Sequence, residues 1–212
     1  LILLDLLIKI IIKLSKRNCC GANKMQSFNM INVAHTLLLD KVKQAQIMLD
    51  ATCGNGFDTL FLSKNSLSQA EIYAFDIQPE AIANSKKLLK EQGVEHKVSW
   101  FCDNHINFSD YIKNKLDVVI LNLGYLPNGD KNITTTAPTT ILLLEKLLIK
   151  LNVGGIVAIT SYPGHNEGFA ENLILQDQLQ TLPSKYFTVA SFKMINHSDK
   201  APVFYIIEKV RG

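Results

Sequence analysis

Apolar and polar residues follow one another along the chain in blocks that predict alternating strands and helices. Short apolar runs typical of buried strands occur five times, at residues 47–51, 71–76, 98–101, 116–121 and 156–160. Segments with the helical spacing of apolar residues lie at 31–42, 59–63, 79–93, 138–151 and 167–182. Two final segments, 187–193 and 203–208, alternate apolar and polar residues as paired antiparallel strands do.

This alternation predicts an α/β fold of the Rossmann-like type. We expect a mostly parallel seven-stranded sheet with helices on both faces and an antiparallel C-terminal hairpin. Asn29 or Asn32 can cap the first helix, and Pro79 and Pro138 stand where later helices would begin. The pair Gly154-Gly155 is expected to turn the chain into its fifth strand.

Residues 1–24 are interpreted as an extension outside the fold, with a single domain over residues 25–212 that begins naturally at Met25. The apolar run up to Leu14 is too short and too charged to span a bilayer, so we expect no membrane partner. A surface amphipathic helix is the alternative for this segment.

Composition narrows the class of protein only moderately. The 212 residues are enough for one domain with a sizeable core, and 47% hydrophobic with 19% charged residues is typical of globular proteins. A net charge of +3 permits a nucleic-acid partner without requiring one. The four cysteines show no metal-ligand spacing with the five histidines, so we expect no metal site and free thiols in a reducing, cytoplasmic compartment.

The chain is organised around a glycine turn at residues 50–56, Asp-Ala-Thr-Cys-Gly-Asn-Gly, which follows the first strand. A strand that breaks into such a turn and then a helix is how α/β sheets hold nucleotide-like ligands. Thr59 stands where the dinucleotide fingerprint has its third glycine. The carboxylate of Asp50 would repel a pyrophosphate, but it suits the cationic groups of S-adenosylmethionine (SAM), which we therefore predict as the cofactor.

Further acidic residues end the next two strands. Asp76 lies twenty positions after Gly56, where a carboxylate accepts the hydroxyls of a ribose; a helix cap before Pro79 is the alternative. Asp103 lies where an adenine amino group would bind, or it is an ordinary loop carboxylate. The predicted cofactor site consists of Asp50, Thr52, Gly54, Asn55, Gly56, Asp58, Asp76, Ile77, Gln78, Asp103 and Asn104.

Three motifs together resemble one enzyme family. They are the glycine turn, the run Asn122-Leu123-Gly124-Tyr125-Leu126-Pro127 followed by Gly129-Asp130-Lys131, and the run Tyr162-Pro163-Gly164-His165. With them, residues 25–211 resemble the YtqB/MnmM-type family of SAM-dependent methyltransferases, long labelled rRNA methylases. The resemblance implies N-methylation of the 5-aminomethyl group of (2-thio)uridine at the tRNA wobble position, giving the 5-methylaminomethyl form. The implied partner is therefore the tRNA anticodon loop.

The chemistry needs a neutral amine held in line with the methyl group, so positioning carries most of the catalysis. Asn122 can accept an N–H of the amine, although Leu123-Gly124 replaces the two prolines that other amino-methylating enzymes have here. Tyr125 is predicted to stack on the base or to close the pocket, with a packed core tyrosine as the alternative. His165 is predicted to take up the amine's proton or to contact a phosphate, with a solvated loop histidine as the alternative. Predicted substrate contacts are Leu123, Gly124, Pro127, Lys131 and Tyr162.

Two other residues are assigned structural roles. Cys53 has no acid–base partner nearby in the sequence, so we interpret it as packing, and His35 is expected to be a satisfied structural histidine. The alternative functions are a methyltransferase acting on rRNA or on a small-molecule amine, and a non-catalytic RNA-binding protein with a relic SAM pocket. The apolar helix at 141–151 and the last strands can serve a homodimer interface.

Overall fold

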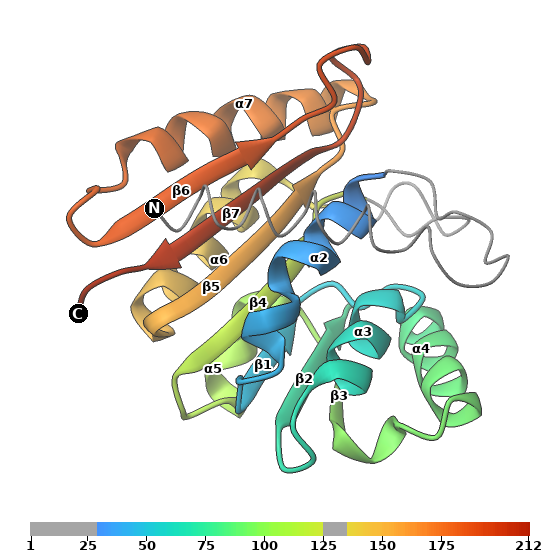
Figure 1. The fold of residues 1–212 in the computed structure, drawn as a ribbon. Coiled ribbons are helices and arrows are strands. Elements are labelled where there is room, and N and C mark those ends of the chain that lie inside the picture. The colour runs from blue at the N-terminus through green and yellow to red at the C-terminus, as the bar shows by residue number, and fades with distance from the viewer. Residues whose placement is uncertain (1–28, 125–134) are drawn as a thin grey trace, which may run out of the picture.

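The computed structural model describes residues 29–124 and 135–212. The predictions for residues 1–24 and for Tyr125, Pro127 and Lys131 lie outside these ranges. Within them the chain forms one seven-stranded sheet with the strand order β3-β2-β1-β4-β5-β7-β6 (Figure 1). The strands are β1 Ile47–Asp50, β2 Glu71–Asp76, β3 Val98–Cys102, β4 Leu116–Asn122, β5 Leu151–Ser161, β6 Phe187–Phe192 and β7 Val203–Lys209.

The first five strands pair in parallel, and β7 pairs antiparallel with both β5 and β6. The predicted fold class, with its antiparallel C-terminal pair, is therefore confirmed. The chain order reverses between β1 and β4, which makes their carboxyl ends the topological switch point where ligands of such sheets bind.

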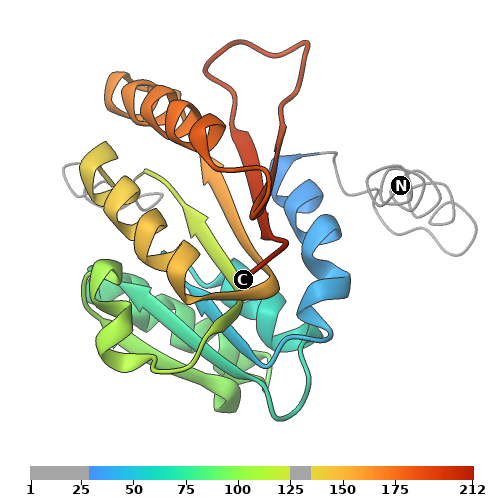
Figure 2. The ribbon, with the colours of Figure 1, turned by 90° about the vertical axis from the view of Figure 1, so that its left-hand side faces the viewer.

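Helices cover both faces of the sheet (Figures 1 and 2). One buried cluster joins the sheet to α5, α6 and α7, and two others join its opposite face to α2, α3 and α4. The helices are α2 Met30–Val42, α3 Phe57–Asn65, α4 Pro79–Glu91, α5 Phe108–Tyr111, α6 Ala137–Lys150 and α7 Asn166–Thr181, with short 3-10 turns at Glu95–Lys97 and His105–Asn107. None of the helices in the two described ranges has the length and apolar character needed to cross a membrane.

Local sequence explains how these helices begin. Asn29 caps α2, because its Oδ1 accepts a hydrogen bond from the backbone N–H of Asn32 at 2.9 Å. Thr136 and Thr139 form a reciprocal capping box at the start of α6, where Pro138 occupies the first turn.

The expectation that Gly154-Gly155 turns the chain into the fifth strand was wrong, because β5 already begins at Leu151. The two glycines lie inside the strand, where the pairing with β4 shifts register between Leu116 and Val118. Gly154 has φ +76°, and a Cβ at Gly155 would stand 2.9 Å from the carbonyl oxygen of Asn152. The glycines therefore allow an irregularity within the strand rather than a turn before it.

Candidate active site

The glycine turn connects the carboxyl end of β1 to α3. Gly54 and Gly56 have φ +49° and +84°, in the left-handed region that favours glycine, and Gly56 is the N-cap of α3. The turn is tied to the neighbouring strands, since Ala51 N donates to Ile120 O at 2.9 Å and Cys53 N donates to Phe75 O at 2.9 Å. The backbone of the turn is thus held at the switch point.

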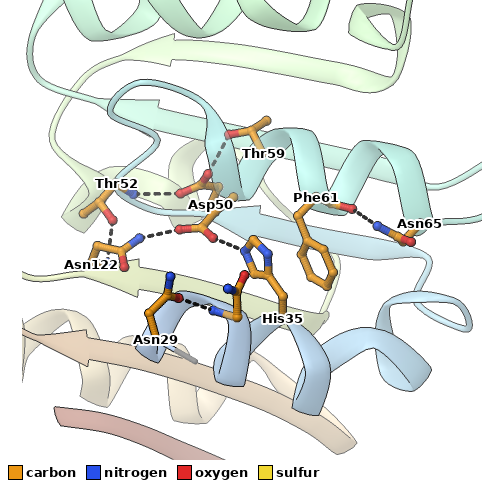
Figure 3. A network of polar contacts seen from close by, with 10 residues as sticks. Asn29, His35, Asp50, Thr52, Thr59, Phe61, Asn65 and Asn122 are labelled. Atoms are coloured by element: carbon orange, nitrogen blue, oxygen red, sulfur yellow. Dashed lines mark hydrogen bonds and ion pairs between the residues drawn. The ribbon is translucent and has the colours of Figure 1, made fainter. Parts of the chain in front are cut away.

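Asp50 is fully buried at the base of the turn. Its Oδ2 accepts a hydrogen bond from Thr59 Oγ1 at 2.5 Å, and its Oδ1 accepts one from Thr52 N at 3.3 Å (Figure 3). Burial first, then the nearby carboxylate of Asp58, raises the pKa of Asp50 to about 7, although the two hydrogen bonds oppose the shift. Asp50 therefore resists ionisation unless positive charge is nearby.

Asp76 lies beside this turn, as predicted from its place at the end of β2. Its Oδ2 accepts from Gly54 N at 3.0 Å, and its Oδ1 accepts from Gln78 N at 3.0 Å. Ile77 follows it with a half-exposed side chain. Asp76 therefore joins the turn to the start of α4, and the carboxylate stays partly accessible to a ligand.

Asp103 and Asn104 lie at the carboxyl end of β3. Asp103 accepts from Tyr111 Oη at 2.8 Å and from Asn107 Nδ2 at 3.1 Å, and the bond from Tyr111 contributes most to lowering the pKa of Asp103. Asn104 caps the following 3-10 turn through Ile106 N. Both side chains have protein partners, and they border the site next to β2.

Asn122 ends β4 and is held on two sides. Its backbone N donates to Thr52 Oγ1 at 2.7 Å, and its Nδ2 donates to Asp58 Oδ2 at 2.6 Å. The other oxygen of Asp58 lies 2.5 Å from His35 Nε2 on α2. Figure 3 shows His35, Thr52 and Asn122 converging from three different segments of the chain. His35 has a hydrogen-bond partner, as expected of a structural histidine, but that partner, Asp58, belongs to the candidate site.

Leu123 and Gly124 continue from β4. Leu123 is buried, and its N donates to Thr160 O at 2.8 Å. Gly124 has φ +125°, and its N donates to Thr135 Oγ1 at 2.8 Å, while Thr135 Oγ1 donates to the buried carboxylate of Glu171 at 2.9 Å. These bonds bring residues 124 and 135 together and anchor them to α7.

His165 is the N-cap of α7, because its Nδ1 accepts a hydrogen bond from Gly168 N at 3.1 Å. A neutral histidine that accepts at Nδ1 carries its proton on Nε2. The cap therefore places the proton of the neutral ring on Nε2, which is buried in this structure. Tyr162 lies near the Asp58 carboxylate, since burial first and then that charge raise the pKa of Tyr162.

Two residues near the turn have clear local roles. Cys53 is buried, and burial raises the pKa of its thiol, so packing describes it better than nucleophilic catalysis does. His105, which the sequence prediction missed, donates from Nδ1 to the carbonyl of Ala51 at 3.0 Å, and burial lowers the pKa of His105. It holds the backbone directly after β1.

Three carboxylates, those of Asp50, Asp58 and Asp76, surround the turn closely enough for the charges of Asp58 and Asp76 to raise the pKa of Asp50. In residues 29–124 and 135–212, no lysine or arginine forms an ion pair with any of the three. The site is therefore negatively charged and suits a cationic ligand.

A family model described as "Putative rRNA methylase" matches residues 72–208. The chain belongs to this family. It is a SAM-dependent methyltransferase, and the negatively charged turn fits the cationic sulfonium and ammonium groups of that cofactor.

Three similar proteins each match most of the chain. An Arabidopsis thaliana protein named chloroplastic tRNA (mnm(5)s(2)U34)-methyltransferase is 32% identical over 188 residues, which is 84% of this chain and 68% of that protein. A Clostridium thermocellum structure described as a "putative rRNA-methylase" is 36% identical, with a TM-score of 0.83, and the match covers 87% of this chain and 100% of that chain. A Streptococcus mutans protein described as "a putative methyltransferase" and solved in complex with SAH is 30% identical, with a TM-score of 0.75, and the match covers 87% of this chain and 99% of that chain.

Proposed function

We propose that this enzyme transfers the methyl group of SAM to the amine of 5-aminomethyl-(2-thio)uridine at the wobble position of tRNA, giving the 5-methylaminomethyl form. The name of the Arabidopsis relative supports the substrate. The observation that carries the chemistry is Asn122, whose side chain is fixed at the switch point beside the glycine turn. A homodimer and a cytoplasmic location remain predictions.

In this proposal the cofactor is held by the turn and by the acids that end β1, β2 and β3. Asp76 would bind the ribose hydroxyls, Asp103 and Asn104 would border the adenine with Ile77, and Asp50 would face the cationic end. Bound SAM supplies an electrophilic methyl group on a positively charged sulfur. The residues of the chain contribute by holding the amine in line with the methyl group. Positioning a nucleophile in this way lowers the activation free energy by up to about 7–11 kcal/mol.

Asn122 would accept one N–H of the neutral amine and direct the nitrogen lone pair at the methyl carbon. The amine nitrogen forms the new N–C bond, the S–C bond breaks with its electron pair left on sulfur, and the surplus amine proton passes to solvent. His165, which caps α7 through Nδ1, is proposed to contact a phosphate of the anticodon loop. Tyr125, Pro127 and Lys131 are proposed contacts from the segment between Gly124 and Thr135, and Leu123, Gly124 and Tyr162 complete the proposed substrate set.

The test is methyl transfer in vitro from labelled SAM. Purified tRNA that carries the 5-aminomethyl group should be methylated, and the same tRNA lacking the aminomethyl group should not. Asn122→Ala should lower kcat by about a hundredfold. Equal labelling of rRNA or of free small amines would support the rival methyltransferase functions. RNA binding without any transfer would support the non-catalytic one.

A further inference from the structure

The contact between His35 and Asp58 links α2 to Asn122, the candidate catalytic residue. α2 precedes β1, yet His35 on this helix reaches Asp58 at the start of α3, 23 positions later in the sequence. The His35 ring also stacks on Phe61, with centroids 3.9 Å apart and planes 5° apart. The histidine is therefore fixed both by its ring contact and by its bond to the carboxylate.

The Asp58 carboxylate divides its two oxygens between two donors. Oδ1 contacts His35 Nε2, and Oδ2 accepts from Asn122 Nδ2. An ionised carboxylate can only accept hydrogen bonds, so the ring nitrogen must carry a proton and the Asn122 side chain must present its NH₂ group. The bond from Asn122 N to Thr52 Oγ1 fixes the backbone of the same residue.

This arrangement removes the usual freedom of a carboxamide to exchange its oxygen and nitrogen positions. With the NH₂ group committed to Asp58, the oxygen of Asn122 faces the opposite way. An oxygen in that place accepts an N–H from an amine, whereas an NH₂ group there would compete for the amine's lone pair. The orientation of Asn122 thus decides whether the lone pair is available for methyl transfer.

We infer that Asp58 and His35 are positioning residues for this reaction: Asp58 orients the Asn122 side chain, and His35 holds Asp58 from α2. The inference rests on the proposed amine methylation. The sequence predicted that Asp58 contacts the cofactor, whereas this inference makes it a positioning residue. Loss of a cofactor contact would chiefly weaken the Kd for SAM, and loss of positioning would chiefly lower kcat.

The test separates kcat from the affinity for SAM. Asp58→Asn can present either an oxygen or an NH₂ group to Asn122, so kcat should fall by about ten- to a hundredfold. The Kd for SAM should weaken much less, by about threefold at most, because only one of the three nearby carboxylate charges is lost. His35→Phe keeps the ring stacked on Phe61 but loses the N–H, and should lower kcat by about tenfold. His35→Gln keeps a donor without the ring and should recover most of that loss.

Asp40→Asn is the matched control, since Asp40 is an exposed carboxylate on α2 that pairs only loosely with Lys43, at 3.8 Å. It should leave kcat, KM and Kd unchanged. Melting temperatures of all four variants show whether each is folded. A SAM Kd that weakens in step with the loss of kcat would overturn the inference in favour of cofactor binding. An unchanged kcat in folded Asp58→Asn would show that the pair merely anchors α2.

Assays of the wild-type enzyme distinguish a failure of this inference from a failure of the proposed substrate. If it methylates another amine but not the 5-aminomethyl tRNA, the substrate proposal fails and the same variants are measured on the amine that it does use. If its acceptor is not an amine, both fail together with the role of Asn122, and the variants would then show no selective loss of kcat.

Discussion

Gly56 lies directly against Ser85, so that a Cβ at position 56 would stand 2.8 Å from Ser85 Cα and 2.9 Å from Ser85 Oγ. The contact packs the start of α3 against α4, and Ser85 Oγ in turn donates to the carbonyl of Gly54 at 2.8 Å. Since the obstructing atom is backbone, no rotamer change can relieve the overlap. The glycine turn therefore owes its shape to the packing of α4 as well as to its own dihedral angles.

Gly56→Ala should destabilise the protein by about 2 kcal/mol or more and weaken SAM binding by at least about tenfold, because both φ +84° and the overlap with Ser85 oppose a side chain. Gly93→Ala is the control. Gly93 has a similar φ of +69°, but a Cβ there would meet no atom within 4 Å, and the residue follows the far end of α4. It should cost about 1 kcal/mol and leave the SAM Kd unchanged by calorimetry. Equal losses of SAM affinity in the two variants would contradict this account of the turn.

The raised pKa of Asp50 predicts a pH-dependent SAM affinity. Its pKa moves from 3.8 to about 7, so the ligand-free protein holds a proton there below neutral pH, and a cationic ligand must displace it. The Kd for SAM should therefore weaken by about tenfold between pH 8 and pH 6. Asp50→Asn should bind more weakly at pH 8 and lose most of this dependence. An unaltered pH profile in Asp50→Asn would place the titrating group elsewhere.

The same shift affects the stability of the ligand-free protein. A raised pKa means that the folded state binds the proton more tightly than the unfolded chain, so the contribution of Asp50 to stability is full below about pH 4 and is lost as pH rises toward 7. Asp50→Asn should therefore melt a few degrees higher than the wild type at pH 8 without ligand. Thermal melts at pH 5 and pH 8 measure this difference, which should shrink at the lower pH.

Asp76 should determine the stabilisation by SAM. Saturating SAM is expected to raise the melting temperature by about 5–10 °C, as a ligand at a hundred times its Kd adds about 2.7 kcal/mol. Asp76→Ala should remove most of that increase. Asp117→Ala is the comparison, since Asp117 accepts hydrogen bonds from Gln46 N and Ile47 N at the amino ends of β4 and β1, away from the predicted cofactor site. It should lower the starting melting temperature yet keep the SAM response.

The two described cysteines should differ in reactivity. Burial raises the pKa of Cys53, while Cys102 is exposed, so iodoacetamide at pH 8 should alkylate Cys102 and spare Cys53 until the protein unfolds. Peptide mass mapping reads out both sites. Cys53→Ala should keep methyl transfer within about threefold, at a cost of about 1 kcal/mol for the lost packing. A Cys53→Ala enzyme that is folded, binds SAM and transfers no methyl group would restore the nucleophile hypothesis.

The strands of the sheet and the acidic residues at their ends could be predicted from the sequence, because both depend on the local pattern of apolar and polar residues. β2 runs over Glu71–Asp76 as predicted, and Asp50, Asp76 and Asn122 lie at one edge because parallel strands align their carboxyl ends. The irregular start of β5 escaped prediction, since a register shift depends on the neighbouring strand rather than on Gly154-Gly155 alone.

The polar network of the site was harder to foresee. His35 reaches Asp58 only because α2 packs across the sheet next to α3, and the sequence carries no signal for that packing. His165 matched a motif, but its cap to Gly168 depends on backbone geometry that the motif does not show. Side chains at strand ends were predictable here, whereas pairs made across elements needed the fold.

Mass spectrometry of tRNA nucleosides from a strain lacking this gene tests the central claim most directly. The account predicts loss of the 5-methylaminomethyl nucleoside with build-up of the 5-aminomethyl form, restored by the wild-type gene and not by Asn122→Ala. An unchanged set of tRNA nucleosides in the deletion strain would contradict it.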